Sequence, residues 1–203
     1  MKFAAEYLRS TTTVGDYPRW NRVEVALAGR SNVGKSSLLN ALTESRGLAR
    51  TSKTPGRTRA LNFFGLGAGL ALVDLPGFGY AKMARADAAH LGGLINDYLT
   101  QREALAGLVL LIDARRGPEA EELALLAMSD RHDASGVALN PLTIVVAATK
   151  CDKLRRSQRA AALKPFAAHG LEPILCSAES GEGLEELRRR IIAIGRNYSR
   201  LSA

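Results

Sequence analysis

The chain has 203 residues, of which 46% are hydrophobic and 24% are charged. That length suits one α/β domain with a sizeable core, and that composition excludes a disordered chain. A net charge of +8 at pH 7 fits a polyanionic partner beyond a nucleotide, although it equally fits a merely soluble surface.

Nothing in the sequence indicates export or membrane insertion. The N-terminus lacks the sustained apolar core of a secretory signal, and the longest apolar run, around residues 142–148, is only long enough for a strand. Two cysteines are too few for a disulfide framework in a chain of this size, and the three histidines have no metal-ligand spacing. We therefore expect a cytoplasmic protein with no membrane partner.

The predicted elements alternate between buried strands and helices after an N-terminal extension. The extension covers residues 1–21, and its residues 3–8 have a composition compatible with a short helix. Residues 60–64 and 70–73 form two strands whose short connecting turn requires an antiparallel hairpin. The other elements are a strand at 22–28, helices at 38–42 and 84–104, a strand at 108–112, a helix from Pro118, a strand at 142–148, a helix at about 156–168, a strand at 173–176 and a last helix from Leu184.

This order predicts an α/β fold with a mostly parallel, six-stranded sheet, one antiparallel edge strand and helices on both faces. One domain spans residues 22–198, and a C-terminal tail follows at 199–203. In such sheets ligands bind at the carboxyl ends of the strands, and each polar motif described below begins where a predicted strand ends.

The first of these motifs matches the P-loop pattern, in which a glycine and four further residues precede glycine, lysine and serine. It consists of Gly29, Arg30, Ser31, Asn32, Val33, Gly34, Lys35, Ser36 and Ser37. Between a strand and a helix, its backbone N–H groups form an anion-binding nest for phosphates; the alternative is a chance glycine-rich turn. Lys35 reaches the β- and γ-phosphates, and Ser36 offers a hydroxyl to Mg²⁺.

A second motif, Asp74-Leu75-Pro76-Gly77, closes the strand at 70–73. In a nucleotidase, a carboxylate at this place holds Mg²⁺ through water, and a glycine N–H meets the γ-phosphate. By itself the motif is ordinary Pro-Gly turn chemistry, but its order behind the P-loop favours the phosphate interpretation. We therefore expect Lys35 and Gly77 to act on the transferred phosphoryl group.

Two further motifs indicate which base is bound. In Thr149-Lys150-Cys151-Asp152, the Asp152 carboxylate can accept hydrogen bonds from N1–H and N2–H₂ of guanine, and the stem of Lys150 can lie over the base. The alternative is an aspartate that caps the following helix. Cys176, Ser177 and Ala178 close the next strand, where a backbone N–H is placed to meet guanine O6.

Together the motifs resemble the translation-factor class of P-loop GTPases and, more closely, the bacterial EngB-type ribosome-biogenesis GTP-binding proteins. The resemblance covers nearly the whole chain, from about Trp20 to Ile194, and is most specific at 29–37, 54–58, 62–64, 74–81 and 149–152. It implies a Ras-like G domain that binds GTP and GDP with Mg²⁺ and hydrolyses GTP. It also implies a monomer that binds a large ribosomal subunit precursor, a family role also described under cell division and septation.

The resemblance assigns a Mg²⁺ site and a nucleotide-binding loop. Ser36 and Thr58 would ligate the ion directly and Asp74 through water, with Thr58 ordered only around the triphosphate and acting in catalysis. Thr51 and Thr54 are neighbouring candidates for the role of Thr58. The loop residues that the resemblance places at the nucleotide are Gly56, Arg57, Thr58, Arg59 and Ala60.

Departures from other GTPases suggest slow hydrolysis. Phe78 stands where Ras-like GTPases place the glutamine that orients water, so we expect an unassisted rate near ~10⁻⁴ s⁻¹ unless Arg57 or Arg59 substitutes for it. Asn32 suggests a K⁺ site beside the phosphates; the alternative is an asparagine that braces the loop. Thr149 replaces the usual asparagine, a variation that EngB-type proteins share.

The leading hypothesis is therefore a GTP-switched assembly factor that binds ribosomal RNA and protein, with no DNA partner expected. Arginines cluster at 115–116, 155–156 and 188–190 and continue to Arg196 and Arg200, and each cluster is alternatively a solvated helix face. The rival hypotheses are a P-loop phosphotransferase, such as a nucleotide kinase, and a Ras-like signalling switch.

Overall fold

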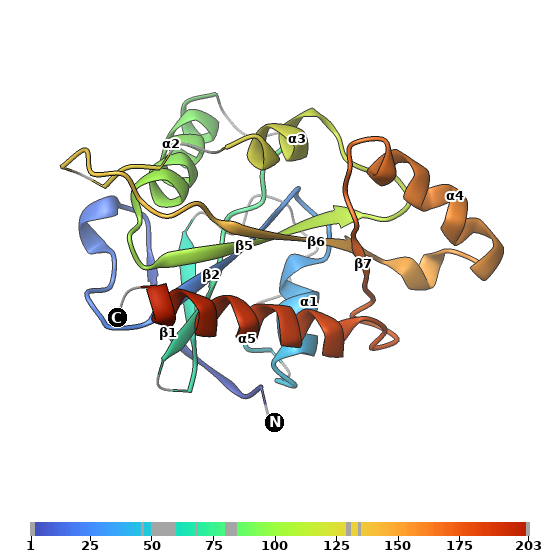
Figure 1. Cartoon of the computed structure of the whole chain (residues 1–203), viewed down its shortest axis with the longest axis horizontal. Coiled ribbons are helices and arrows are strands. Elements are labelled where there is room, and N and C mark those ends of the chain that lie inside the picture. Colours follow the sequence, from blue (N-terminus) through green and yellow to red (C-terminus); the bar gives the residue numbers. More distant parts are fainter. Residues whose placement is uncertain are drawn as a thin grey trace.

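The structure is a computed structural model of the whole chain, and it describes residues 3–45, 47–49, 60–67, 69–79, 85–128, 131–133 and 135–201. A seven-stranded sheet with the order β1-β3-β4-β2-β5-β6-β7 forms its middle layer, and helices cover both faces (Figure 1). The strands are β1 Ala5–Thr11, β2 Val23–Gly29, β3 Leu61–Leu66, β4 Leu70–Asp74, β5 Leu105–Asp113, β6 Thr143–Thr149 and β7 Ile174–Leu175. The α-helices are α1 Lys35–Leu42, α2 Arg85–Gln101, α3 Ala120–Leu126, α4 Arg156–Ala167 and α5 Leu184–Leu201, and short 3₁₀ turns lie at Val14–Asp16 and Cys151–Lys153.

Alternate residues of the central strands face two separate apolar cores. On β2, Val25 and Leu27 pack with α1 and α5, whereas Ala26 and Ala28 pack on the side of α2. Side chains of successive strand residues point to opposite faces, so a strand buried on both faces is apolar at most of its positions. The parallel α/β fold predicted from the sequence is confirmed, as is the antiparallel pairing of β3 with β4.

The sheet has one strand more than predicted, and the prediction of a helix near residues 3–8 is wrong. Residues 5–11 form β1, which pairs antiparallel with β3 from Thr11 opposite Leu61 to Ala5 opposite Leu66. β1 therefore takes the edge position that the sequence assigned to β3. The side of β3 that faces away from β4 offers unpaired backbone groups, and the extension satisfies them by forming a strand.

The rest of the extension contacts the start of β2, at the end of this strand that lies away from the P-loop. There the carboxylate of Glu24 is completely buried. It accepts hydrogen bonds from Trp20 Nε1 at 2.9 Å, Tyr98 Oη at 2.9 Å and Arg102 Nε at 3.0 Å. Burial and the neighbouring Glu24 raise the pKa of Tyr98 well above its usual value, so this phenol stays a donor. The network joins the extension, β2 and α2.

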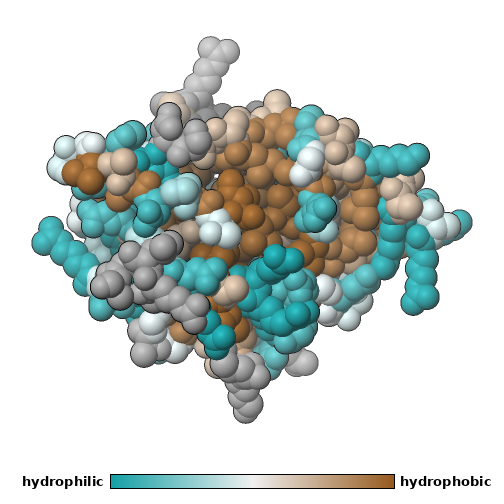
Figure 2. Space-filling model, viewed as in Figure 1, coloured by the Kyte–Doolittle hydropathy of each residue, from teal (hydrophilic) through white to brown (hydrophobic). Residues whose placement is uncertain are grey.

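One face of the molecule is markedly apolar. Figure 2 shows apolar side chains gathered over the region of β5 and β6, between the helices of the two layers. β7 is short and pairs only with Ala147 and Ala148, so the first part of β6 has no neighbour on that side among the described strands. Ile144 and Val145 are accordingly only half-buried.

Candidate functional site

The polar motifs found in the sequence meet at one edge of the sheet. The P-loop follows β2, Asp74 ends β4, Thr149 ends β6, and Cys176 follows β7. β2, β4, β6 and β7 all run in the same direction, so their carboxyl ends lie together. This is the place where open α/β sheets bind ligands.

The P-loop turns sharply into α1. Gly34 has a φ of 100°, a left-handed conformation that disfavours any side chain, and its carbonyl accepts the first helical hydrogen bond, from Leu38 N at 2.8 Å. α1 begins at Lys35, so the N–H groups of its first turn, including that of Ser36, have no partner within the helix. These free donors at the positive end of the helix make the site suited to phosphate.

Lys35 and Asp74 form a buried ion pair across this site. Lys35 Nζ lies 2.9 Å from Asp74 Oδ1, and the two side chains are 8% and 3% exposed. The contact lacks hydrogen-bond geometry, and Asp74 Oδ1 is a buried oxygen without a hydrogen-bond donor. A carboxylate oxygen of this kind fits a hydrated Mg²⁺ beside a phosphate, with the half-buried Ser36 hydroxyl one helical residue away from Lys35.

The Asp74–Gly77 loop packs directly on the P-loop. Ser31 N donates to Phe78 O at 2.9 Å, and a side chain at Gly77 would lie 3.1 Å from the backbone nitrogen of Ser31. Leu75 is buried in the core and Pro76 is also buried. The two predicted phosphate-binding loops are therefore in contact, so that a displacement of one must displace the other.

Arg30 contributes to this region through its backbone and points its side chain elsewhere. Its guanidinium forms ion pairs with Glu119 and Glu121 at the start of α3. Glu119 also pairs with Arg116 at 2.8 Å. The side chain of Arg30 thus ties the P-loop to α3 and does not lie among the phosphate-binding groups.

The predicted base-recognition loop is tied to the P-loop by two side chains. Thr149 Oγ1 lies 2.8 Å from the carbonyl oxygen of Val33 and donates to it, while Lys150 Nζ donates to the carbonyl oxygen of Asn32 at 2.6 Å. Thr149 is buried, and its hydroxyl makes this link at the position where GTPases more usually carry an asparagine. Both contacts hold the base loop and the phosphate loop in fixed relation.

Asp152 is oriented by the loop after β7. Ser177 Oγ donates to Asp152 Oδ1 at 2.7 Å, and Lys153 Nζ lies 3.1 Å from Asp152 Oδ2. The Ser177 hydrogen bond lowers the pKa of Asp152 below its usual value, so the group is ionised at neutral pH. Ala178 follows Ser177 and is half-buried. An ionised, oriented carboxylate of this kind can accept the two N–H groups of guanine.

The two cysteines lie in the core beneath this loop. Cys151 and Cys176 are fully buried free thiols, and Cys151 N donates to the carbonyl oxygen of Cys176 at 3.2 Å. Burial raises the pKa of Cys151 to about 11 and that of Cys176 to about 12. Both thiols are therefore protonated and serve as packing groups at neutral pH.

The structure also brings in charged residues that the motifs did not include. Arg159 of α4 forms a double hydrogen bond with Glu182, whose loop follows Ser177, and Asp113 forms ion pairs with Arg115 and Lys150. Asp113 ends β5, so the rule that ligand-side groups follow strand ends was the signal that pointed to it. Nothing in the sequence pairs Arg159 with Glu182.

Part of the predicted site lies outside the described residues. Gly56, Arg57, Thr58 and Arg59 belong to this part, as do the alternative threonines Thr51 and Thr54. Ala60 is described; it is half-buried and directly precedes β3. Within the described ranges, no helix combines the length and apolarity needed to cross a membrane.

The fold and this edge define a P-loop guanine-nucleotide-binding GTPase. A family model described as "50S ribosome-binding GTPase" matches residues 24–148. The "Probable GTP-binding protein EngB" of Pelotomaculum thermopropionicum is 44% identical over 90% of this chain and 91% of that protein, and the one of Desulfatibacillum aliphaticivorans is 40% identical over 93% and 90%. The chain belongs to the EngB family of GTP-binding proteins.

The fold is also that of a solved member. The crystal structure of a probable GTP-binding protein EngB superposes with a TM-score of 0.63, at 23% identity, over 86% of this chain and all of that one. This structure supports the fold alone, whereas the family model and the relatives confirm the predicted family, and with it the binding of guanine nucleotides and the GTPase class.

Proposed function

We propose that this chain is a GTP-controlled switch that acts in assembly of the large ribosomal subunit. The observation that carries the switch is the contact of the two phosphate loops, in which Ser31 N donates to Phe78 O at 2.9 Å beside the buried pair of Lys35 and Asp74. GTP and GDP differ by the phosphate that these residues would hold, so binding of GTP and of GDP would place the Phe78 segment differently. The description of the matching family model supports a ribosomal partner.

Mg²⁺ would be held by the hydroxyls of Ser36 and Thr58 and, through water, by Asp74. When bound, the ion would neutralise charge on the phosphate oxygens. Lys35 would bind the β- and γ-phosphates, and the N–H of Gly77 would contact the γ-phosphate. The buried Asp74 oxygen that lacks a hydrogen bond supports this assignment.

We propose that intrinsic hydrolysis is slow. Phe78 is half-buried against the apolar cluster on the α2 side of the sheet, and an apolar ring cannot orient an attacking water molecule. The rate should lie near ~10⁻⁴ s⁻¹ without assistance, and the ribosomal partner or K⁺ near Asn32 would accelerate it. Arg57 and Arg59 remain candidates for a compensating role.

The ion pairs of the surface arginines indicate which of the basic clusters can bind RNA. Arg188 binds the carbonyl oxygens of Ala41 and Leu42 at the end of α1, and Arg189 and Arg190 pair with Glu186. This cluster is therefore partly structural and partly neutralised, in contrast to a free basic patch.

Two other arginines are better placed to bind phosphate. Arg155 and Arg156 are exposed at the start of α4 and form no ion pair with a described residue. Arg156 acts on Glu182 only through space, so both guanidinium groups can still contact a polyanion, and each phosphate contact that they make should add to the salt dependence of binding. We propose that they contact ribosomal RNA.

Co-sedimentation with purified ribosomal subunits tests the proposal. The protein bound to a non-hydrolysable GTP analogue should sediment with the large subunit, and the protein bound to GDP should be retained less. The double variant Arg155→Ala/Arg156→Ala should lose retention and salt dependence, whereas the matched variant Arg189→Ala/Arg190→Ala on α5 should keep most of both. Absence of retention at low salt would refute the ribosomal role and leave a GTPase that acts as a signalling switch as the alternative.

A further inference from the structure

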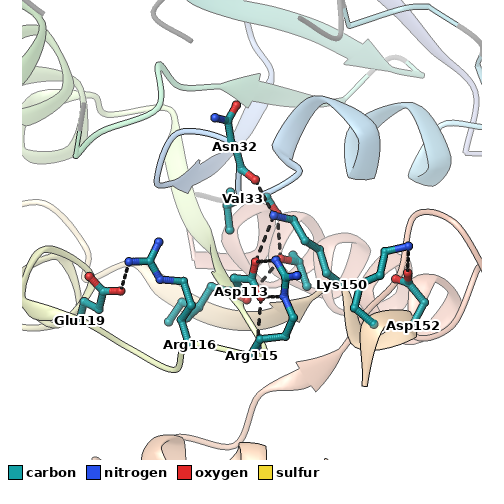
Figure 3. Close-up of polar contacts among 11 residues, drawn as sticks. Asn32, Val33, Asp113, Arg115, Arg116, Glu119, Lys150 and Asp152 are labelled. Carbon is teal, nitrogen blue, oxygen red and sulfur yellow. Dashed lines mark hydrogen bonds and ion pairs between the residues drawn. The ribbon is translucent and has the colours of Figure 1, made fainter. Parts of the chain in front are cut away.

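The ammonium group of Lys150 joins three parts of the nucleotide site. Figure 3 shows its side chain reaching back from the end of β6 toward the P-loop and the end of β5. Lys150 Nζ donates to the carbonyl oxygen of Asn32 at 2.6 Å and lies 3.0 Å from Asp113 Oδ2. One cation therefore connects the phosphate loop, the base loop and a strand end that carries no known motif.

Both residues joined by this hydrogen bond have unfavourable backbone conformations. Lys150 has a φ of 59° and Asn32 a φ of 63°, in the left-handed region that residues with a side chain rarely occupy. Such a conformation costs free energy and persists only where the surroundings of the residue enforce it. The contacts of Lys150 Nζ add to the backbone hydrogen bonds beside the two residues, from Val33 N to Arg30 O at 3.2 Å and from Lys153 N to Lys150 O at 3.0 Å.

The side chain of Asp113 is held in this position by burial and by hydrogen bonds from Arg115. The carboxylate side chain is 9% exposed, and Oδ1 accepts hydrogen bonds from Arg115 N at 3.1 Å and Arg115 Nε at 2.9 Å. Oδ2 accepts from Arg115 Nη2 at 2.6 Å and faces Lys150. Burial by itself would raise the pKa of Asp113, but the bonds from Arg115 and Lys150 hold it well below the usual value.

We infer that Asp113 is a positioning residue for the guanine-nucleotide site, because it anchors the Lys150 ammonium at the P-loop and thereby sets the Lys150 stem over the base. This inference rests on the proposed placement of the nucleotide between the P-loop and Asp152. Asp113 does not touch the nucleotide; it acts through Lys150. Without the charge of Asp113, the backbone of Lys150 relaxes from its left-handed conformation, and the Lys150 stem no longer lies over the face of the base.

The contribution of Asp113 to nucleotide affinity should not depend on which groups the edge of the base carries, whereas the contribution of Asp152 should. Inosine diphosphate lacks the 2-amino group that Asp152 reads in guanosine diphosphate, but it presents a similar ring to the stem of Lys150. Loss of Asp113 should therefore lower the affinities for GDP and for IDP by the same factor. Loss of a residue that reads the base edge changes their ratio.

Calorimetric titration of GDP and IDP into Asp113→Asn tests the inference. Both affinities should fall by about tenfold to about a hundredfold, the range for a lost charged hydrogen bond. In a Lys150→Met background, where the anchored group is absent, Asp113→Asn should cause little further loss, since residues that act as one unit are not additive. Arg190→Ala on α5 is the control: this exposed side chain pairs with Glu186 and takes no part in the network of Asp113, so both affinities should stay within about twofold.

Thermal unfolding without nucleotide separates positioning from general stability, and Asp113→Ser replaces the asparagine variant if that protein does not fold. Unchanged GDP affinity in the variant overturns the inference, as does a loss of equal size in the wild-type and Lys150→Met backgrounds. A changed ratio of GDP to IDP affinity also overturns it, because Asp113 would then act on the base edge. Failure of the wild-type protein to bind GDP would instead refute the nucleotide site itself.

Discussion

Replacement of Asp152 by asparagine should change which purine nucleotide the protein binds. In the structure Ser177 Oγ donates to Asp152 Oδ1 at 2.7 Å. In Asp152→Asn this donor needs an acceptor, so it should hold the amide oxygen at the Oδ1 position and leave the NH₂ group at the Oδ2 position. That NH₂ group faces the N–H groups of guanine with another donor, but it matches the C2 carbonyl of xanthine.

The size of the effect follows from the hydrogen bonds exchanged. Guanine loses one hydrogen bond to a charged acceptor, worth about 1.5–3 kcal/mol, and the NH₂ group that replaces that acceptor adds about 1–3 kcal/mol for a donor left unpaired. The other hydrogen bond is kept, but to a neutral acceptor, so GDP affinity should fall about 10²- to 10⁴-fold. Xanthosine diphosphate should gain affinity and bind the variant more tightly than GDP does. The lost ion pair with Lys153 adds little, because that lysine is 59% exposed.

Competition binding with GDP and xanthosine diphosphate measures both changes. Ser177→Ala serves as the partner variant, since it removes the orienting hydroxyl while leaving the carboxylate, and it should weaken GDP without favouring xanthine. Asp152 has a lowered pKa and remains ionised until the pH falls through that value, so wild-type GDP affinity should stay level from about pH 8 to about pH 5. An unaltered preference for GDP in Asp152→Asn would refute base recognition by this residue.

Four further predictions concern other parts of the molecule. Glu24→Gln should lower the free energy of unfolding by about 2–4 kcal/mol, because Arg102, whose side chain is only 14% exposed, then faces a neutral amide. Urea denaturation measures this loss, and a value below about 0.5 kcal/mol contradicts the prediction. GTP hydrolysis should be faster in KCl than in NaCl, and Asn32→Ala should remove the difference; equal wild-type rates would rule out a K⁺ site there. In Asp74→Asn, chelation of Mg²⁺ should change GTP affinity much less than in the wild type, and an equal change would exclude Asp74 from the ion site. Cys151 and Cys176 should resist iodoacetamide at pH 8 in the folded protein and react after unfolding in urea, because burial raises their pKa values to about 11 and about 12; rapid native labelling would show that the loop opens.

Short stretches of sequence are enough to predict those elements whose conformation depends only on residues close together in the chain. The P-loop is readable because a turn into a helix needs Gly34 in a left-handed conformation and Lys35 at the helix start, within a few residues of each other. The buried strands can be recognised because a strand covered on both faces is apolar along its length, as in residues 105–112 of β5. The order of these elements then placed every motif at one edge of the sheet.

Long-range pairing decided the rest. Residues 5–11 are a strand only because the edge of β3 lies beside them, and no local period in the segment records that neighbour. Arg188 looked like one of three basic surface residues, yet it binds two carbonyl oxygens at the end of α1, which are far away in sequence.

The same division holds within the site. The sequence by itself determined a guanine-nucleotide GTPase of the EngB family, because its motifs combine residue type with spacing along the chain. Only the tertiary structure decided that Lys150 meets both Asn32 and Asp113, since these residues come from three separate parts of the chain. Side-chain contacts between strand ends depend on the order of strands in the sheet, and that order brings β5 beside β6 and places Asp113 next to the base loop.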